Sequence, residues 1–465
     1  MKRLESSDIS DRSSSYLGSL IDSLTRRSRL LWRRGAPEAQ PQQDEDLVNM
    51  AEALLSRRGE ASGVALAQHL LSAYASASRD RQLDFLLALA EHFGPDTRQL
   101  DLALEALQRD RSPATMTALH GASEPRRQQL FRRLNLAPGG TRALIKMRED
   151  LLSHLRDHDA LQCVDTDFTH LFASWFNRGF LILRPIDWSS PAFILEKIIQ
   201  YEAVHEIRDW DDLRNRLQPR DRRCYAFFHP QLPDEPVIFV EVALTKEIPG
   251  KIQPLLDLER EIVSEADATT AVFYSISNTQ NGLRGVSFGN FLIKQVVENL
   301  KAEFPGLQTF VTLSPVPGFS AWLAKERAQS GSALGEEILS RLTVLDRQGW
   351  AEDEQSVDET RHLLEQAAAY YFLRAKNSKG RPIDPVAQFH LGNGARLEAI
   401  NMLGDRSDKG LRQSHGMMVN YLYKPDDIEA NHEAFAEKGV VAASSAVRKL
   451  LPANLQSRDL VVSET

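Results

Sequence analysis

The fold is decided by residues 272–319, VFYSISNTQNGLRGVSFGNFLIKQVVENLKAEFPGLQTFVTLSPVPGF. Residues 272–278 are rich in β-branched and aromatic side chains, which predicts a strand. Residues 291–304 carry apolar side chains at i, i+4 and i+8, which predicts a helix. A second strand is predicted for residues 308–313. The order strand, glycine-rich loop, helix, strand predicts a mixed α/β or α+β unit.

The same texture continues through the second half of the chain. Residues 223–230 and 237–244, RCYAFFHP and VIFVEVAL, predict a hairpin of strands joined by a proline-rich turn. A helix is predicted to begin with Ser190 as its N-cap and Pro191 as its first residue. More helices and a last strand follow, at 334–345, 362–375 and 420–423. We therefore expect a mixed α/β domain over residues 186–465.

The first half has a helical texture instead. Residues 66–74 and 83–94 place apolar side chains on one face with a period near 3.6. Proline and glycine interrupt these segments at short spacing, which predicts an antiparallel all-α helical bundle over residues 46–185. Residues 1–45 are predicted to be a flexible arm that ends in a polar linker. The sequence thus predicts a multi-domain protein, all-α first and mixed α/β second.

The composition excludes several classes of protein. With 465 residues and a formal net charge of −8, the chain lacks the overall basic charge of a nucleic-acid-binding protein. No apolar run approaches the ~20 residues of a spanning helix, so we expect no membrane span. Cys163 and Cys224 are too few for a disulfide framework or a cysteine-rich metal site. The histidines show no zinc-binding spacing, so no metal is expected.

The N-terminal residues bear on the compartment. They are polar and show no apolar secretory signal, which predicts a cytoplasmic location. Residues 16–32 form a basic amphipathic pattern, which leaves mitochondrial import as an alternative. Acidic residues such as Asp8, Asp11 and Asp22 interrupt this pattern, and transit peptides are poor in acidic residues. We therefore favour a frayed arm or a helix that binds a partner.

The strongest chemical signal is the loop of residues 281–290, NGLRGVSFGN, between the first predicted strand and its helix. Glycines before a helix N-terminus let backbone N–H groups approach an anion closely. The spacing matches neither the dinucleotide-binding pattern nor the P-loop. The loop resembles the pattern Q/R-x-x-G-x-G/A with which acetyltransferases of the GNAT type grip the pyrophosphate of coenzyme A. An ordinary glycine-rich turn is the alternative reading of this loop alone.

Three further segments hold side chains suited to chemistry: LSPVPGF (313–319), FHLGNGA (389–395) and QSHGMMVNYLY (413–423). Ser314 ends a predicted strand, and two prolines fix the backbone that follows it. Ser314 lies outside any G-x-S-x-G elbow, which excludes an α/β-hydrolase. His390 lies in an apolar stretch that is typical of a strand. Taken singly, Ser314 as a turn residue and His390 as a core histidine both remain open.

Taken together, six segments resemble the malonyl-CoA decarboxylase family, in the family's order over roughly residues 180–425. The segments are RPIDWSSPAFILEKIIQYEAVHEIRDWDDL, CYAFFHPQLPDEPVIFVEVALT, FYSISNTQNGLRGVSFGNFLIK, FVTLSPVPGF, FHLGNGA and SHGMMVNYLY. The resemblance implies a catalytic domain of the GNAT acyltransferase fold behind a helical bundle. It also implies the conversion of malonyl-CoA to acetyl-CoA and CO2. The coenzyme A thioester is then the substrate, with no metal, prosthetic group or other cofactor.

The resemblance also assigns residues by position. It implies that Ser314 and His390 are the catalytic pair, which stabilises an enolate and protonates the α-carbon. Asn393 and Tyr421 are secondary candidates for contact with the oxyanion. Animal members carry a glutamate where this chain has Ser287, so we assign no acid–base role there. The residues matched to the coenzyme A loop are Arg284, Gly285, Val286, Ser287, Phe288, Gly289 and Asn290.

Two alternatives stay open beside a decarboxylase. A coenzyme A-dependent acyltransferase on the same fold would need an acceptor pocket. A non-catalytic sensor would bind malonyl-CoA and leave it intact. The family resemblance and the large helical half imply a homo-oligomer, either a dimer or a tetramer. We expect malonyl-CoA as the partner and no nucleic acid.

Overall fold

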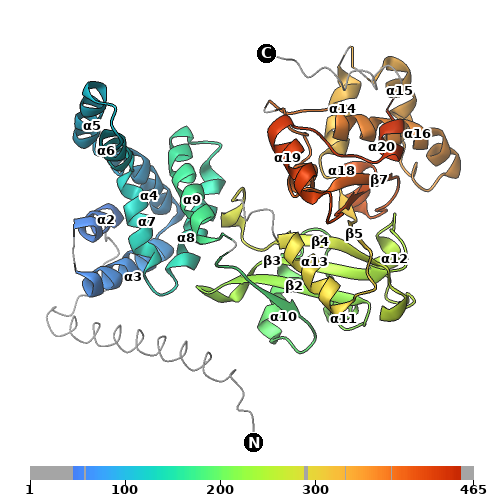
Figure 1. The fold of residues 1–465 in the computed structure, drawn as a ribbon, viewed down its shortest axis with the longest axis horizontal. Helices are drawn as coiled ribbons and strands as arrows, with labels where there is room; N and C mark the ends of the chain where they lie inside the picture. The colour runs from blue at the N-terminus through green and yellow to red at the C-terminus, as the bar shows by residue number, and fades with distance from the viewer. Residues whose placement is uncertain are drawn as a thin grey trace, which may run out of the picture. The chain divides into compact units, whose positions relative to one another are not determined.

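The structure is a computed structural model that describes residues 46–56, 59–177, 179–286, 292–329, 331–332, 334–378 and 380–451. The chain divides into two compact units, residues 1–176 with 280–287, and residues 177–279 with 288–465. The first unit is helical and the second is built on a mixed sheet, as the sequence predicts (Figure 1). The predicted arm of residues 1–45 lies outside the described residues.

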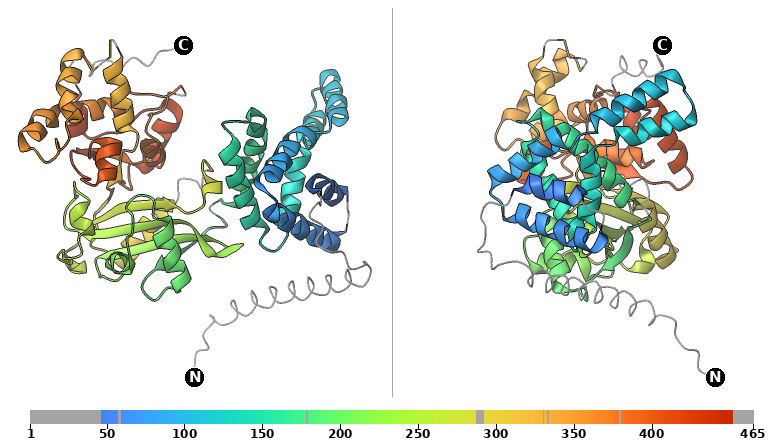
Figure 2. Two further views of the ribbon diagram at one scale, coloured as in Figure 1. Left: turned by 180° about the vertical axis from the view of Figure 1, so that it is seen from behind. Right: turned by 90° about the vertical axis from the view of Figure 1, so that its left-hand side faces the viewer.

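The helical unit consists of short helices joined by tight connections. Side chains of Ser78, Asp96 and Ser112 accept backbone N–H groups at three of the helix starts, as N-caps do. Figure 2 shows α5 and α6 as a hairpin at one end of this unit. The helices are α2 (Leu47–Ser56), α3 (Glu60–Ser76), α4 (Arg79–His92), α5 (Thr97–Arg109), α6 (Pro113–Ser123), α7 (Arg126–Asn135), α8 (Gly140–His154), η1 (Asp159–Leu161) and α9 (Gln162–Trp175).

The core of the helical unit is aromatic and contains buried ion pairs. The Phe131 and Phe168 rings stack with their centroids 4.1 Å apart. Arg148 Nε donates to Asp165 Oδ1 at 2.8 Å, and its Nη1 donates to the carbonyl of Gly282 at 2.7 Å. Gly282 belongs to this unit although it follows a strand of the other one. A Cβ at Gly282 would lie 2.0 Å from the carbonyl oxygen of Ile145, so only glycine fits.

The second unit is organised around one sheet in the order β1-β2-β3-β4-β5-β8-β6, with β7 paired to β8. The β1–β4 strands pair antiparallel, and β4 pairs parallel with β5 from Thr270↔Thr309 to Phe273↔Thr312. The strands are β1 (Ile182–Ile186), β2 (Arg222–His229), β3 (Leu232–Thr245), β4 (Thr270–Asn278), β5 (Thr309–Thr312), β6 (Ser314–Pro315), β7 (Arg396–Asn401) and β8 (Met418–Leu422).

Helices cover both faces of this sheet. Buried side chains of α10 and α11 pack with Cys224 and Ala226 of β2 on one face. On the other face, Tyr225 Oη donates to Glu303 of α13, which Figure 1 shows lying across the strands. The helices and 3-10 turns of this unit are α10 (Ala192–Tyr201), α11 (Trp210–Leu217), α12 (Gln253–Leu256), η2 (Glu265–Asp267), α13 (Leu292–Glu303), α14 (Phe319–Ala328), α15 (Glu336–Arg341), η4 (Leu342–Asp346), α16 (Glu354–Leu373), α17 (Pro385–Gly392), α18 (Asp408–Ser414), α19 (Ile428–Lys438) and α20 (Ser445–Lys449), whereas η3 (Asn281–Leu283) lies in the helical unit.

A charged cluster is buried under the α11 face of the sheet. Arg216 is 2% exposed and donates to Asp212 Oδ1 at 3.1 Å and to Glu241 Oε2 at 3.2 Å. Its Nη1 also donates to the carbonyl of His205 at 2.8 Å. Burial raises the pKa of the Glu241 carboxyl above its usual value, and the Arg216 guanidinium opposes this rise by stabilising the carboxylate. We call Arg216, Asp212 and Glu241 the charged cluster.

Some local predictions were wrong. The stretch around His390 is helix α17 and not a strand, because Asp384 caps it and Pro385 fits its first turn. The helix that follows Ser190 begins at Ala192, with Pro191 at the N-cap. Strands β1 and β7 had not been predicted; β1 contains a proline, which disfavours a strand. In the part of the chain that the structure describes, no helix is long and apolar enough to cross a bilayer.

Candidate active site

Ser314 and His390 meet in the sheet unit. Ser314 Oγ lies 3.2 Å from His390 Nε2, although 76 positions separate the two residues. Ser314 begins β6, which follows directly after β5, and His390 lies on the buried face of α17. Both side chains are nearly inaccessible to solvent, with 5% and 3% exposure. The two residues that the resemblance implied as a catalytic pair are therefore in contact, and their catalytic role stays a prediction.

The helix that carries His390 is fixed at both ends. Asp384 accepts the backbone N–H of Ala387 at 2.8 Å, which satisfies one of the free donors of the first turn. The segment after the helix turns at Gly394, where φ is +81° and a Cβ would lie 2.2 Å from the carbonyl oxygen of Ile428. The position of His390 is thus set by local capping and by a close approach that glycine permits.

A chain of hydrogen bonds extends from the pair in both directions. His390 Nδ1 lies 2.8 Å from Tyr423 Oη. Ser314 Oγ donates to Thr312 Oγ1 at 2.8 Å. Tyr423 and Thr312 are 1% and 0% exposed. The four side chains Tyr423, His390, Ser314 and Thr312 therefore form one buried row, which we call the polar row.

The polar row is uncharged. Burial lowers the pKa of His390 to about 3, so its imidazole is neutral at pH 7. Burial likewise raises the pKa of Tyr423 well above its usual value, so its phenol stays protonated. The imidazole stacks on the ring of Tyr421, with centroids 4.6 Å apart and planes inclined by 23°. The surroundings of Ser314 and His390 are thus polar without being ionic.

The secondary candidates have structural contacts of their own. Asn393 Nδ2 donates to the carbonyl of Phe389 at 2.6 Å, at the end of α17. Among the described residues, Tyr421 has a buried hydroxyl with no hydrogen-bond partner, and its ring contacts His390. His415, from the same segment as Tyr421, packs against Trp350 instead, with centroids 6.3 Å apart. Contact of Asn393 or Tyr421 with an oxyanion stays a prediction.

The predicted coenzyme A loop is described only in part. The turn η3 and Arg284 to Val286 lie in the helical unit, and Gly285 has φ of +78°. Arg284 is exposed and Val286 is buried. Gly282, counted among the anion-binding glycines from sequence, packs against α8. The remaining matched residues, Ser287, Phe288, Gly289 and Asn290, lie outside the described residues.

Comparison with known proteins decides the family. The family model for the malonyl-CoA decarboxylase C-terminal domain matches residues 179–461, and the model for the N-terminal domain of the same family matches residues 93–176. The chain belongs to the malonyl-CoA decarboxylase family.

Curated members of the malonyl-CoA decarboxylase family match most of the chain. The mitochondrial malonyl-CoA decarboxylase of Anser anser anser is 36% identical over 400 residues, which cover 79% of each chain. The mitochondrial enzyme of Rattus norvegicus is 34% identical over 408 residues, with 80% of this chain and 82% of the relative covered.

Solved structures agree with the family. The crystal structure of malonyl-CoA decarboxylase from Rhodopseudomonas palustris is 62% identical, with a TM-score of 0.84, and covers 87% of this chain and 98% of that one. The structure from Agrobacterium vitis is 56% identical with the same TM-score of 0.84, and covers 88% of this chain and 100% of that one.

The sequence analysis did not identify two members of the polar row, Thr312 and Tyr423. Thr312 precedes Ser314 by two positions in a strand, so the two side chains share a face. That spacing could have pointed to Thr312. Tyr423 follows the end of β8, two positions after Tyr421, and no sequence signal distinguishes which tyrosine hydroxyl bonds to the imidazole.

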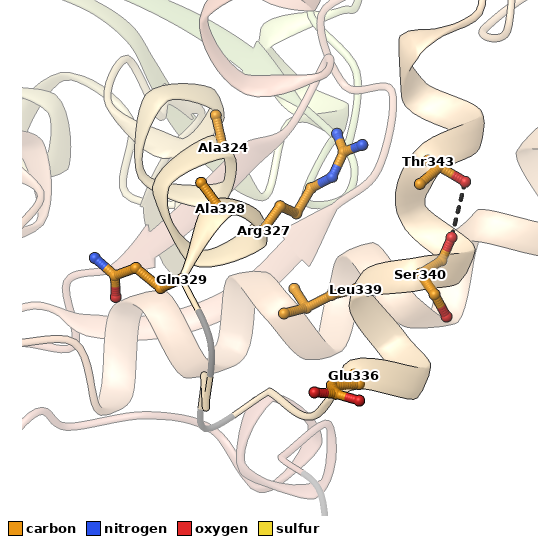
Figure 3. Close-up of a pocket in the computed structure, with 8 residues that line it drawn as sticks. All are labelled: Ala324, Arg327, Ala328, Gln329, Glu336, Leu339, Ser340 and Thr343. Carbon is orange, nitrogen blue, oxygen red and sulfur yellow. Dashed lines mark hydrogen bonds between the residues drawn. The ribbon is translucent and has the colours of Figure 1, made fainter.

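A separate pocket holds none of the predicted site residues. It has a volume of about 580 Å³ and opens between α14 and α15 (Figure 3). Arg327, the cation that lines it, is paired with Asp346, with Nη1 to Oδ1 at 2.9 Å. The lining residues are Ala324, Arg327, Ala328, Gln329, Glu336, Leu339, Ser340 and Thr343.

Proposed function

We propose that the protein is a carboxy-lyase that converts malonyl-CoA to acetyl-CoA and CO2 at Ser314 and His390. The observation that carries the proposal is the buried 3.2 Å contact between Ser314 Oγ and His390 Nε2 in a member of this family. Relatives that match about four-fifths of the chain are named malonyl-CoA decarboxylases.

The reaction requires one bond to break and one to form. The bond between the α-carbon and the carboxylate breaks, CO2 leaves, and its electron pair passes to an enolate of the thioester. A proton then joins the α-carbon. In the proposal, the pair of Ser314 and His390 stabilises the enolate and delivers that proton to the α-carbon. Solvent returns the proton to the pair after acetyl-CoA leaves, so the balance needs no oxidant, metal or cofactor.

The neutrality of the polar row supports this chemistry. A cation beside the carboxylate would stabilise the starting malonyl group more than the leaving CO2, which is uncharged. The described contacts of His390 are with Ser314, Tyr421, Tyr423 and Phe389, all of them uncharged. A carboxylate placed there exchanges water for weaker partners, and this favours its loss.

Compartment and assembly stay predictions. A cytoplasmic homo-oligomer was expected from sequence, with mitochondrial import as the alternative. The two curated relatives are named mitochondrial, which supports the alternative.

The test is direct. Purified protein is incubated with malonyl-CoA and no acyl acceptor, and acetyl-CoA and CO2 are measured by mass spectrometry. We expect stoichiometric release of both, and a fall in kcat of about 10²-fold or more in Ser314→Ala and in His390→Ala, the scale of a lost general acid or oxyanion donor. Turnover that needs an added acceptor would identify an acyltransferase. Binding without turnover would identify a sensor, and full activity in either folded variant would reject its role.

A further inference from the structure

Thr312 lies where two strands of the site stop pairing through their backbones. β8 pairs with β5 at Val311↔Leu422 and with β6 at Ser314↔Val419. Between these two positions, side chains of β5 and β8 provide hydrogen bonds. The backbone N–H of Tyr421 donates to Thr312 Oγ1 at 3.2 Å, and Asn420 Nδ2 donates to the carbonyl of Thr312 at 2.9 Å. The rotamer of Thr312 is therefore fixed by the sheet itself.

The hydroxyl of Thr312 receives two donors. A backbone N–H can only donate, so the contact with Tyr421 requires Thr312 Oγ1 to accept. Ser314 Oγ is its second donor, at 2.8 Å. The two accepted bonds use both lone pairs of the Thr312 oxygen. The proton of Ser314 therefore points to Thr312, and the lone pairs of Ser314 remain for its other neighbour.

That neighbour is the imidazole. Since Ser314 Oγ accepts at its 3.2 Å contact, His390 Nε2 must carry the hydrogen. In a neutral imidazole the other nitrogen then has a free lone pair. His390 Nδ1 accepts from Tyr423 Oη at 2.8 Å, which completes the row without a conflict between donors.

We propose that Thr312 is a positioning residue that orients the Ser314 hydroxyl and thereby keeps His390 in the tautomer with hydrogen on Nε2. This inference rests on the proposed function of Ser314 and His390. Without the Thr312 hydroxyl, Ser314 is free to rotate its proton toward Nε2, and the imidazole then carries its hydrogen on Nδ1. The nitrogen that faces Ser314 would lose the proton that the reaction uses.

The experiment compares three substitutions with the wild-type protein. Thr312→Val keeps the β-branched shape and removes the hydroxyl, and Thr312→Ser keeps the hydroxyl. Thr312→Cys replaces the hydroxyl by a weak acceptor of similar size. We expect kcat to fall about 10-fold in Thr312→Val with KM unchanged, the effect of one neutral hydrogen bond. Thr312→Ser should return to within about threefold of wild type, with Thr312→Cys between the two.

A second readout separates positioning from mere support of the fold. The ¹⁵N shifts of labelled histidine, assigned to His390 with the His390→Gln variant, report which ring nitrogen is protonated. We expect protonated Nε2 in the wild type and in Thr312→Ser, and a shift toward protonated Nδ1 in Thr312→Val or, where that variant does not fold, in Thr312→Cys. An unchanged tautomer and unchanged kcat in folded Thr312→Val or Thr312→Cys would overturn the inference. An inactive wild-type protein would overturn the proposed function instead.

Discussion

The sheet carries two buried polar groups of opposite character. The charged cluster of Arg216, Asp212 and Glu241 lies on the face of α11, whereas Thr312 and the rest of the polar row lie beyond the other face of β5. Successive side chains of a strand point to opposite faces of the sheet. Val311 and Leu313 pack in the same core as Ala243, which lies on the same face of β3 as Glu241. Thr312, between Val311 and Leu313, therefore lies on the opposite face. The charged cluster pairs opposite charges, and the polar row consists of uncharged side chains.

This difference separates support of the fold from chemistry. Buried ions must be paired with opposite charges, and removing one partner strongly destabilises the fold because it leaves an unpaired buried charge. A site that removes a carboxylate as CO2 works faster without a fixed cation, since a cation would stabilise the carboxylate of the substrate more than the uncharged product. We therefore expect changes in the charged cluster to alter stability and changes in the polar row to alter turnover.

The largest effect is expected from breaking the charged cluster. Arg216→Met leaves Asp212 and Glu241 buried without their cation, which should lower the free energy of unfolding by about 3–5 kcal/mol. Arg214→Met on the same helix is the matched control, because Arg214 is 50% exposed and pairs with exposed Asp211. The control should change stability by less than about 1 kcal/mol. Thermal and denaturant unfolding measure both, and equal stability of the two variants would refute the distinction.

The second effect concerns pH and the neutral imidazole. The pKa of His390 falls from 6.5 to about 3 on folding. Between pH 6.5 and 3, the imidazole of His390 is therefore protonated in the unfolded chain and neutral in the folded chain. The contribution of the neutral imidazole to the free energy of unfolding is complete above pH 6.5 and declines as the pH falls toward 3. The stability of wild type relative to His390→Gln should drop by about 1.4 kcal/mol for each pH unit below 6.5. Urea unfolding at pH 7.5, 6.0 and 5.0 measures it, and a constant difference would show an ordinary imidazole.

The smallest effect sharpens the comparison inside the polar row. Tyr423→Phe removes the donor to His390 Nδ1 and should lower kcat about 10-fold, the scale of one lost hydrogen bond. Tyr421→Phe keeps the stacked ring and removes a hydroxyl that has no partner among the described residues, so kcat should stay within about threefold. Steady-state kinetics of both variants decide the matter. A larger loss in Tyr421→Phe would assign the oxyanion contact to Tyr421.

Much of the fold could be predicted because local patterns agreed with it. The strand, loop, helix and strand of residues 272–313 became β4, α13 and β5, since their apolar periods match their burial. The stretch at His390 misled, because FHL has the apolar texture of a strand. The decisive signal, Asp384 followed by Pro385, lies five residues or more upstream. Strand β1 could not be predicted, because its pairing with β2 is a tertiary contact that overrides the presence of Pro185.

The sequence predicted two residues that the structure brings into contact, and it did not predict the side chains that surround them. Ser314 and His390 were assigned by resemblance, and the structure brings them into contact. The spacing from Ser314 could have pointed to Thr312, but the directions of the hydrogen bonds and the choice of Tyr423 over Tyr421 are not encoded in sequence spacing. The same holds for Gly282. From sequence Gly282 resembles an anion-binding glycine. In the structure, glycine is required there because a Cβ would clash with the carbonyl oxygen of Ile145, which is far away along the chain.

The position of Gly282 has a consequence for engineering the protein. Residues 280–287 continue directly from β4, yet they count with the helices, where Arg148 donates to the Gly282 carbonyl and Asn281 donates to Glu149 at 3.2 Å. The sheet unit expressed alone would therefore leave this stretch without its hydrogen-bonding partners, and a helical unit ending at Phe176 would have an uncovered docking place for the Asn281–Leu283 turn. The two halves are consequently poor candidates for exchange between relatives, because a grafted helical half would have to recognise a turn encoded between β4 and α13.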